Sequence, residues 1–304
     1  MATQAAIVST KKVPQPRNGL WPFWRKFVRV RAAALALLIL VIIVLSGALA
    51  PLLAPFPQNQ QNIMARLKPP LYEGTEGLHL LGTDALGRDI LGRLLWGSRV
   101  SLLVGAASVL VAGTLGVTLG LVAGYFGGSV DAAIMRWTDI QLALPFLIMA
   151  LAVVAVLGSG LWNVIIVLGV TGWVQYARIV RGEVLSVRER EFVLGAYASG
   201  VPTRRILFYH ILPNVTASII VIASLQVARM ILMEASLSFL GLGVPVEIPT
   251  WGRMVADGRD YLSIAPWVAT LPGLAIFTTV LCINICGDRL RDMLDPTLRH
   301  QKEG

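Results

Sequence analysis

The chain has 304 residues, of which 56% are apolar and only 14% are charged. Soluble domains carry roughly 25% charged residues, so this composition excludes an ordinary water-facing surface. The formal charge of +9 comes without a basic stripe interleaved with aromatic residues, which argues against a nucleic-acid partner. We therefore expect an all-α, polytopic integral membrane protein.

Apolar segments long enough to cross a bilayer recur along the chain. A spanning helix needs about 20 mainly apolar residues, because each residue rises 1.5 Å and the hydrocarbon is about 30 Å thick. Asp139 and Arg178 enclose 38 uncharged residues, which suit two crossings joined by a turn at Gly158, Ser159 and Gly160. With these two, about six crossings are predicted: 32–50, 100–124, two within 140–177, 215–233 and 264–287.

These crossings divide the chain into regions. We expect a tail of residues 1–31, a first transmembrane helix within 32–54, an external segment at 55–99, a transmembrane core over 100–287 that includes a loop at 178–214, and a second tail at 288–304. Six crossings place both tails on the same side. The side with the tails and the 178–214 loop carries 18 Lys and Arg, against 7 on the other side. The positive-inside rule therefore predicts cytoplasmic termini.

Glycine recurs every fourth residue at Gly116, Gly120, Gly124 and Gly128. This spacing makes a smooth helix face that a neighbouring helix, from this chain or another, can approach closely.

Signatures of catalysis are missing from the sequence. It contains no Gly-Lys dipeptide, so no phosphate-binding P-loop is present, and ATP is not expected as a cofactor of this chain. Only three histidines occur and the acidic residues are not clustered, so no metal site is predicted. Cys282 and Cys286 are expected to be buried thiols on one helix face. We predict no catalytic residues.

The loop from Arg178 to Asn214 is longer than a simple turn. Its pattern predicts one helix from Arg181 to Ser199, a break at residues 200–202, and a second helix from Thr203 to Ile211 that ends before Pro213. Gly200 supplies a permissive backbone and Pro202 suits a first helical turn. Such a helical pair offers a rigid lever. The alternative is an interfacial amphipathic loop whose arginines only set topology.

The stretch EFVLGAYASGVPTRRILFYHILPN, residues 191–214, resembles the loop shared by permease subunits of bacterial ATP-binding-cassette (ABC) importers. The pattern of that loop is EAA, three residues, Gly, nine residues, and IxLP. Its last Ala and its Gly match Ala196 and Gly200, and its I, L and P fall on His210, Leu212 and Pro213. Leu194 and Gly195 stand in place of its Glu and first Ala.

Three further stretches resemble the second permease of dipeptide, oligopeptide and nickel importers. They are LGTDALGRDILGRLLWGSRVSL at 81–102, EASLSFLGLGV at 234–244 with PTWG at 249–252, and GDRLRDMLDP at 287–296. The resemblance implies a type I permease architecture in the bacterial inner membrane. It also implies three kinds of partner: a second, homologous permease subunit, two cytoplasmic ATPase subunits that bind the ATP, and an extracytoplasmic solute-binding protein.

Dipeptides or oligopeptides are the solutes that this resemblance favours. Nickel, glutathione, opines and oligosaccharides are alternatives within the same kind of machine. An ion-driven secondary transporter is the alternative from another class, but it predicts inverted repeats and acidic residues at the membrane centre, and neither is evident. A membrane enzyme would require clustered polar side chains, which the sequence lacks.

The resemblance also implies an ATPase-coupling role for the 178–214 loop. We expect the short helix around Gly195 to Thr203 to dock into a groove on an ATPase subunit. We also expect Gly200 to let the two loop helices pack closely, and Arg204 and Arg205 to pair with partner acids or lipid phosphates. The coupling residues expected are Glu191, Leu194, Gly195, Ala196, Gly200, Pro202, Arg204, Arg205, His210, Leu212 and Pro213.

Two ionisable residues, Arg229 and Glu234, fall within the fifth crossing. Such residues are costly in a membrane and usually face a cavity or a partner, so both are candidates for the translocation path. Five positions apart, they lie roughly 140° from each other around a helix and should not pair. Alternatively, Glu234 lies near the outer surface and helps to fold the next loop. For the external segment we expect either a contact with the binding protein or an internal ion-paired lid formed by Asp84, Arg88 and Asp89.

Overall fold

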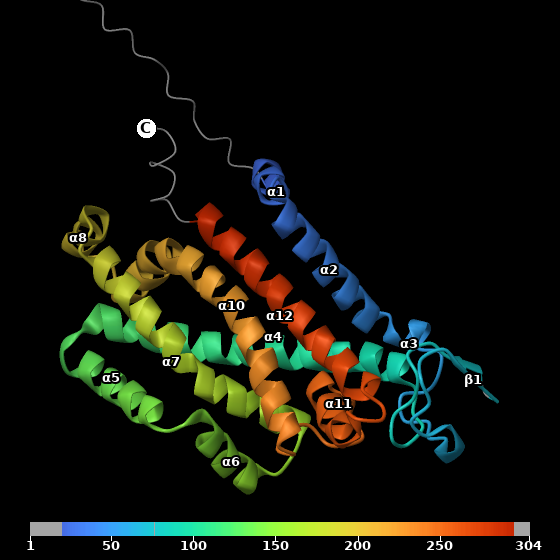
Figure 1. Cartoon of the computed structure of the whole chain (residues 1–304). Coiled ribbons are helices and arrows are strands. Elements are labelled where there is room, and N and C mark those ends of the chain that lie inside the picture. Colours follow the sequence, from blue (N-terminus) through green and yellow to red (C-terminus); the bar gives the residue numbers. More distant parts are fainter. Residues whose placement is uncertain (1–19, 76, 295–304) are drawn as a thin grey trace, which may run out of the picture.

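The computed structural model describes residues 20–75 and 77–294, most of which are helical (Figure 1). The predicted tails therefore lie partly outside the described residues, as does the end of the 287–296 stretch. The helices are α1 (Leu20–Val28), α2 (Arg31–Ala48), α3 (Ala50–Leu53), α4 (Ile90–Phe126), α5 (Gly128–Ala143), α6 (Phe146–Leu157), α7 (Leu161–Arg188), α8 (Glu191–Ala198), α9 (Thr203–Arg205), α10 (Leu212–Phe239), α11 (Trp251–Gly258) and α12 (Trp267–Leu294). The shorter elements are the 3-10 turns η1 (Ile63–Ala65) and η3 (Arg259–Tyr261), the π-helical segment η2 (Ile206–Ile211), and the antiparallel strands β1 (Tyr72–Gly74) and β2 (Gly77–His79).

Five helices are long and apolar enough to cross a membrane: α2, α4, α7, the continuous helix of residues 203–239, and α12. Helices α5 and α6 taken together are also long and apolar enough to cross, but their axes differ by 93° across a short break, as in a broken span or a re-entrant loop. The predicted all-α polytopic fold of about six crossings is confirmed. The turn between α6 and α7 lies at residues 158–160, as the glycines predict.

The third crossing begins earlier than the segment predicted within residues 140–177, and it is not one continuous helix. It begins at Gly128 and breaks at Leu144 and Pro145. Proline has no backbone N–H, and it disfavours the helical conformation of the residue before it. Accordingly Leu144 is extended, with φ −92° and ψ 127°. Hydropathy alone does not reveal this bend, because both halves are apolar.

Helix α4 is longer than the predicted crossing at 100–124. It begins at Ile90, where the Asp89 side chain accepts a hydrogen bond from the Gly92 N–H at 2.7 Å and caps the first turn. Its 37 residues would extend about 55 Å at 1.5 Å per residue. Because that length exceeds the hydrocarbon thickness of about 30 Å, the helix must tilt or project beyond the membrane.

The glycine repeat on α4 packs against α7 of the same chain. A Cβ on Gly120 would lie 2.7 Å from the Ala177 carbonyl oxygen, and one on Gly124 would lie 2.7 Å from Val184 Cβ. These distances are too short for any larger side chain. Gly128 does not belong to this face, since its Cβ position is open and its φ of +54° serves the turn between α4 and α5.

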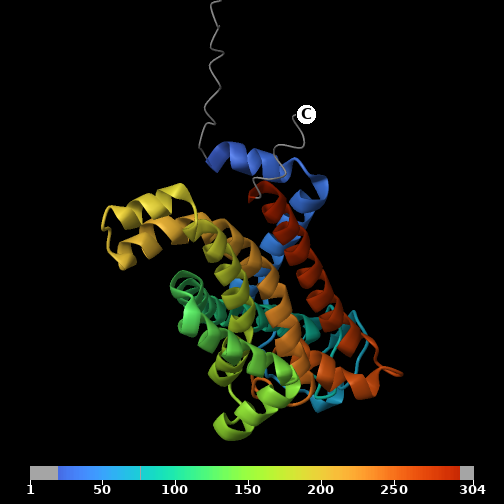
Figure 2. The same ribbon diagram turned by 90° about the vertical axis from the view of Figure 1, so that its left-hand side faces the viewer.

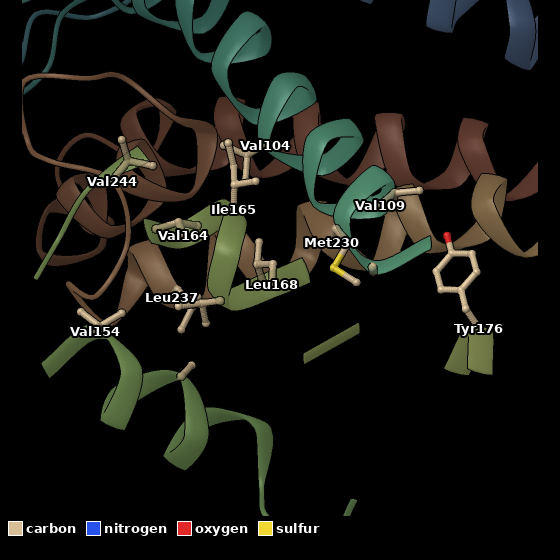
Figure 3. Packing of buried hydrophobic residues seen from close by; sticks show 13 residues of the cluster. Val104, Val109, Val154, Val164, Ile165, Leu168, Tyr176, Met230, Leu237 and Val244 are labelled. Carbon is tan, nitrogen blue, oxygen red and sulfur yellow. The ribbon is translucent and has the colours of Figure 1, made fainter. Parts of the chain in front are cut away.

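The largest apolar core joins α4, α7 and α10. Figure 3 shows Val104 of α4 near Ile165 of α7, and Met230 and Leu237 of α10 in the same cluster, which also includes Val154 of α6. Helix α12 and its neighbours α2 and α11 share a second core with α4 and α10. The helices that flank the loop at residues 189–202 are therefore held together along their lengths.

The elements outside the bundle gather at its two ends. Helices α1 and α8 and the last turn of α12 lie at one end, which we call the α8 end, while β1, β2 and α11 lie at the other, the hairpin end (Figures 1 and 2). The order of the crossings places the 189–202 loop and the basic α1 helix on the same side.

Candidate functional site

The loop predicted to couple to an ATPase is an elbow, which we define as residues 189–211. Helix α7 continues through Arg188, so the predicted helix from Arg181 to Ser199 is two helices, α7 and α8, that meet at Glu189 and Arg190. The predicted second helix does not end before Pro213. It continues through η2 into α10. Pro213 has no backbone N–H to donate, and the π-helical turn just before it changes the hydrogen-bond spacing so that the helix continues.

Gly200 ends α8 in a left-handed conformation with φ +72°. Its N–H donates to the Tyr197 carbonyl at 3.0 Å, and the Val201 N–H donates to the Ala196 carbonyl at 3.1 Å. These two bonds form a Schellman cap, in which glycine is favoured because other residues are strained at positive φ. A Cβ at Gly200 would meet no atom within 4 Å. The expectation that this glycine allows close helix packing is therefore wrong, whereas the permissive backbone is observed.

The inner face of the elbow is fixed to α7 and α10. Val193 of α8 and Ile206 and Ile211 of η2 are buried in one apolar cluster that also contains these side chains of α4, α7 and α10: Leu121, Val180, Val184, Val187 and Val215. A hydrogen bond of 3.0 Å from the Ser218 hydroxyl to the Glu183 carboxylate joins α10 to α7 directly. Because the elbow is packed on both helices, a force applied to α8 reaches them as well.

The outer face of the elbow exposes aromatic side chains that sequence reasoning did not single out. Tyr197 is 72% exposed and Tyr209 is 75% exposed, with Phe192 and Phe208 also outside. An open hollow of about 910 Å³ lies on this face, lined by Pro202, Thr203, Arg204, Arg205, Phe208 and Tyr209. The sequence signal for this face was the presence of aromatic residues at helical positions that face solvent. Exposed apolar patches of this kind mark protein or membrane contacts.

The expected coupling residues, which lie on the elbow and at Leu212 and Pro213 just beyond it, fall into two groups. Those that are exposed are Glu191, Leu194, Gly195, Gly200, Pro202, Arg204, Arg205 and Pro213, and those that are half-buried are Ala196, His210 and Leu212. Arg204 and Arg205 form no ion pair with any residue from 20–75 or 77–294. Both guanidinium groups are therefore available to an acidic partner or a lipid phosphate.

Arg229 and Glu234 face different directions from α10. The Glu234 side chain is fully buried where α4 and α10 meet the start of α11. Its carboxyl accepts a hydrogen bond from the Ser238 hydroxyl at 2.7 Å, and the Ser101 and Thr250 hydroxyls also face it. This position agrees with the alternative interpretation, in which Glu234 helps to fold the segment after α10. Arg229 is exposed and borders a hollow of about 290 Å³ on the bundle.

The charged residues of the external segment form a buried cluster at the hairpin end. The Asp84 carboxylate accepts hydrogen bonds from Arg88 Nε at 2.7 Å and from Arg93 Nη1 at 2.6 Å. Both arginines also contact Asp257 of α11, at 3.3 Å and 3.4 Å. Asp89 pairs with His79 at 2.9 Å instead of joining this network. The cluster therefore fastens the start of α4 to α11, as in the ion-paired alternative.

Comparison with protein families finds two matches that together cover most of the chain. A model described as the binding-protein-dependent transport system inner membrane component matches residues 116–300. A second, the N-terminal TM domain of oligopeptide transport permease C, matches residues 20–70. The matched regions include the elbow, α10 and the hollow beside Arg229.

Curated relatives match over nearly the full length of the chain. The di/tripeptide transport system permease protein DppC of Pseudomonas aeruginosa (strain UCBPP-PA14) is 43% identical, covering 91% of this chain and 92% of its own. The glutathione transport system permease protein GsiD of Pectobacterium atrosepticum is 41% identical, covering 98% and 97%. The oligopeptide transport system permease protein OppC of Bacillus subtilis (strain 168) is 39% identical, covering 95% and 93%.

A solved structure shares the fold at low sequence identity. A chain of the MetNI methionine ABC transporter, in an inward-facing conformation, superposes with a TM-score of 0.55 at 18% identity, covering 67% of this chain and 96% of its own. The likeness is one of fold, and it covers two thirds of the present chain.

Proposed function

Since this chain belongs to the family of binding-protein-dependent transport system inner membrane components, we propose that it is a permease subunit through which an ATP-driven importer moves dipeptides or oligopeptides across the bacterial inner membrane. The relatives named for di/tripeptide and oligopeptide transport support the solute class. In this proposal the solute crosses the membrane along this chain, and the chain does not change it chemically.

The proposed machine needs three kinds of partner. A second, homologous permease subunit completes the path, two cytoplasmic ATPase subunits bind and hydrolyse ATP, and an extracytoplasmic binding protein delivers the solute. The sequence supports this division of labour, because it has membrane spans but no P-loop of its own. The excess of Lys and Arg at the α8 end supports a cytoplasmic position for that end, where the ATPases would dock.

The observation that carries the proposal is the construction of the elbow. Its exposed aromatic face suits a groove on an ATPase subunit, while its buried face is packed on α7 and α10. Closure of the ATPase pair would move α8, and the shared apolar cluster would transmit that movement to both membrane helices. An elbow fixed to a single helix could not move the two together.

Reconstitution tests the function directly. The chain, its partner permease and its ATPases are placed in proteoliposomes with the binding protein outside, and uptake of labelled Ala-Phe is measured. We expect uptake with ATP inside and none with ADP. Uptake driven by a proton or sodium gradient without ATP would overturn the proposal and favour a secondary transporter.

Glutathione is the second candidate solute, because the relative named for glutathione transport matches 98% of this chain. Glutathione is itself a tripeptide, so the two candidates share the peptide bond and free carboxylates. Competition in the same vesicles separates them. A dipeptide importer takes up Ala-Phe, and an excess of other dipeptides inhibits that uptake while glutathione does not. A glutathione importer takes up labelled glutathione, and an excess of dipeptides does not inhibit it.

A further inference from the structure

The hollow beside Arg229 has an unusual position in the fold. It lies where the third crossing breaks, and it is bounded by the α5–α6 break, α7 and α10, with Gln141, Pro145, Thr171, Gln175, Arg229 and Met233 among its lining residues. Thr171 follows the start of α7 by 10 residues, and Arg229 precedes the end of α10 by 10 residues. Both residues therefore lie about 15 Å along their helices from the ends nearest the hairpin end, a distance that is half the thickness of a membrane of about 30 Å.

Arg229 is a cation without a partner at this depth. It is exposed on the bundle, and no described residue from 20–75 or 77–294 forms an ion pair or hydrogen bond with it. None of the residues that line the hollow is acidic. An arginine at the membrane centre is costly when it faces lipid and is generally found facing a partner or a water-filled cavity. The hollow consequently belongs to a surface that lipid does not cover.

The backbone of the α5–α6 break supports the same conclusion. Leu144 and Pro145 are non-helical at the depth of Arg229, and lipid-exposed backbone of this kind does not occur within hydrocarbon. Gln141 holds the break in place. Its Nε2 donates to the Thr171 carbonyl at 3.0 Å and its Oε1 accepts from Trp173 Nε1 at 2.8 Å. Gln141 is thus committed to holding the break. Among the residues that line the hollow, Arg229 carries the charge that can meet a ligand.

We propose that Arg229 binds a carboxylate of the solute as it passes between this chain and the partner permease, an inference that rests on the proposed function. The remaining lining suits a solute with one constant charged end and variable side chains. Met149, Met230 and Met233 supply flexible thioethers that adapt to apolar groups of different shape. Peptides with a free C-terminus have this combination.

Labelling of a cysteine in the hollow measures binding without the binding protein. Gln175 is exposed, so a Gln175→Cys variant of the assembled permease–ATPase complex reports access of a maleimide to the hollow. Peptide mass spectrometry reads the label at residue 175 and separates it from the native Cys282 and Cys286. Ala-Phe and its C-terminal amide, Ala-Phe-NH2, are the two probes. We expect Ala-Phe to slow labelling at a concentration at least about tenfold lower than the amide, as befits a charge-assisted hydrogen bond.

Substitution of Arg229 then tests whether this residue causes the preference for Ala-Phe over Ala-Phe-NH2. In the Gln175→Cys background, Arg229→Gln is expected to remove the difference between the two probes, and Arg229→Lys to retain part of it. Arg136→Gln, which changes an arginine of α5 outside the hollow, should retain all of it. A preference for the free acid that survives Arg229→Gln overturns the inference. Equal protection by the two probes in the parent complex also overturns it. If Arg229→Gln in addition loses the partner permease, Arg229 pairs with that subunit instead.

The result is independent of the test of the proposed function. If the complex takes up peptides with ATP but the two probes protect the introduced cysteine equally, the carboxylate site is wrong and the importer function stands. If no ATP-driven uptake of Ala-Phe occurs, the function itself fails.

Discussion

At the scale of single residues, Gly200 has a role defined by backbone conformation. Its positive φ and the two cap hydrogen bonds end α8 and set the direction of the next helix. Space does not limit this position, because a Cβ there would meet nothing within 4 Å. The residues that substitute well should therefore be those that tolerate the left-handed region, whatever their size.

We predict that transport falls in the order Gly200, Asn, Ala, Val and Pro at this position. Asparagine tolerates the left-handed region, alanine and valine are strained by about 1–2 kcal/mol, and proline fixes φ near −65°. Peptide uptake and peptide-stimulated ATP hydrolysis are the measurements, with membrane insertion checked by the yield of folded protein. If activity instead declines with side-chain volume, so that alanine exceeds asparagine, the turn is limited by contact with the partner.

Asp84 is the second residue with a single defined role, as the shared acceptor for two buried arginines. We predict that Asp84→Asn lowers the free energy of unfolding by about 3–5 kcal/mol, because two buried arginines then share the single carboxylate of Asp257. Thermal unfolding in detergent is the measurement. Asp260→Asn is the control, since its partner Arg259 is exposed and surface pairs contribute little. Equal melting temperatures for the two variants would contradict the buried-network interpretation.

At the scale of elements, the contact of α4 with α7 forms the centre of the molecule. Small residues let the two backbones approach, and the same two helices contribute to the cluster beneath the elbow. This tight contact makes α7 a rigid element between the elbow at one end and the hollow beside Arg229 in its middle. Loosening the contact should therefore affect both stability and coupling.

We predict that Gly120→Ala destabilises the protein by about 1–3 kcal/mol, because the added methyl group would overlap the Ala177 carbonyl. Gly182→Ala on α7 is the matched control. Its Cβ position is open, and alanine is favoured over glycine within a helix, so stability should be unchanged or slightly higher. The yield of monodisperse protein and its melting temperature report the difference. A neutral Gly120→Ala would mean that α4 and α7 separate easily.

At the scale of the whole molecule, the main prediction concerns orientation. Six crossings and the distribution of Lys and Arg place both chain ends in the cytoplasm. A fluorescent protein fused to the C-terminus should therefore fluoresce, and alkaline phosphatase at the same place should be inactive. Fusion within the external segment, after Gly74, should give the opposite result. Active phosphatase at the C-terminus would reverse the topology and separate the elbow from the ATPases.

The apolar crossings, the turn at residues 158–160 and the glycine at the elbow could be predicted because each depends on local properties. A run of about 20 apolar residues specifies a span, and a glycine followed by Val201 and Pro202 specifies a helix end, wherever these segments later pack. The resemblance of the elbow to permease loops likewise rests on contiguous spacing. Local pattern thus determined the fold class, the number of crossings and the place of the elbow.

Tertiary structure alone decided which residues meet. Asp84 joins Asp257 through two arginines, Glu234 turns inward toward Ser238, and the break at Pro145 lies beside Arg229. Gln141 and Gln175, two polar residues within a 38-residue uncharged stretch, were the sequence signal for the hollow. Their meaning depended on helix packing, because the periodicity of one helix gives the direction of a side chain but does not identify the neighbour that it contacts.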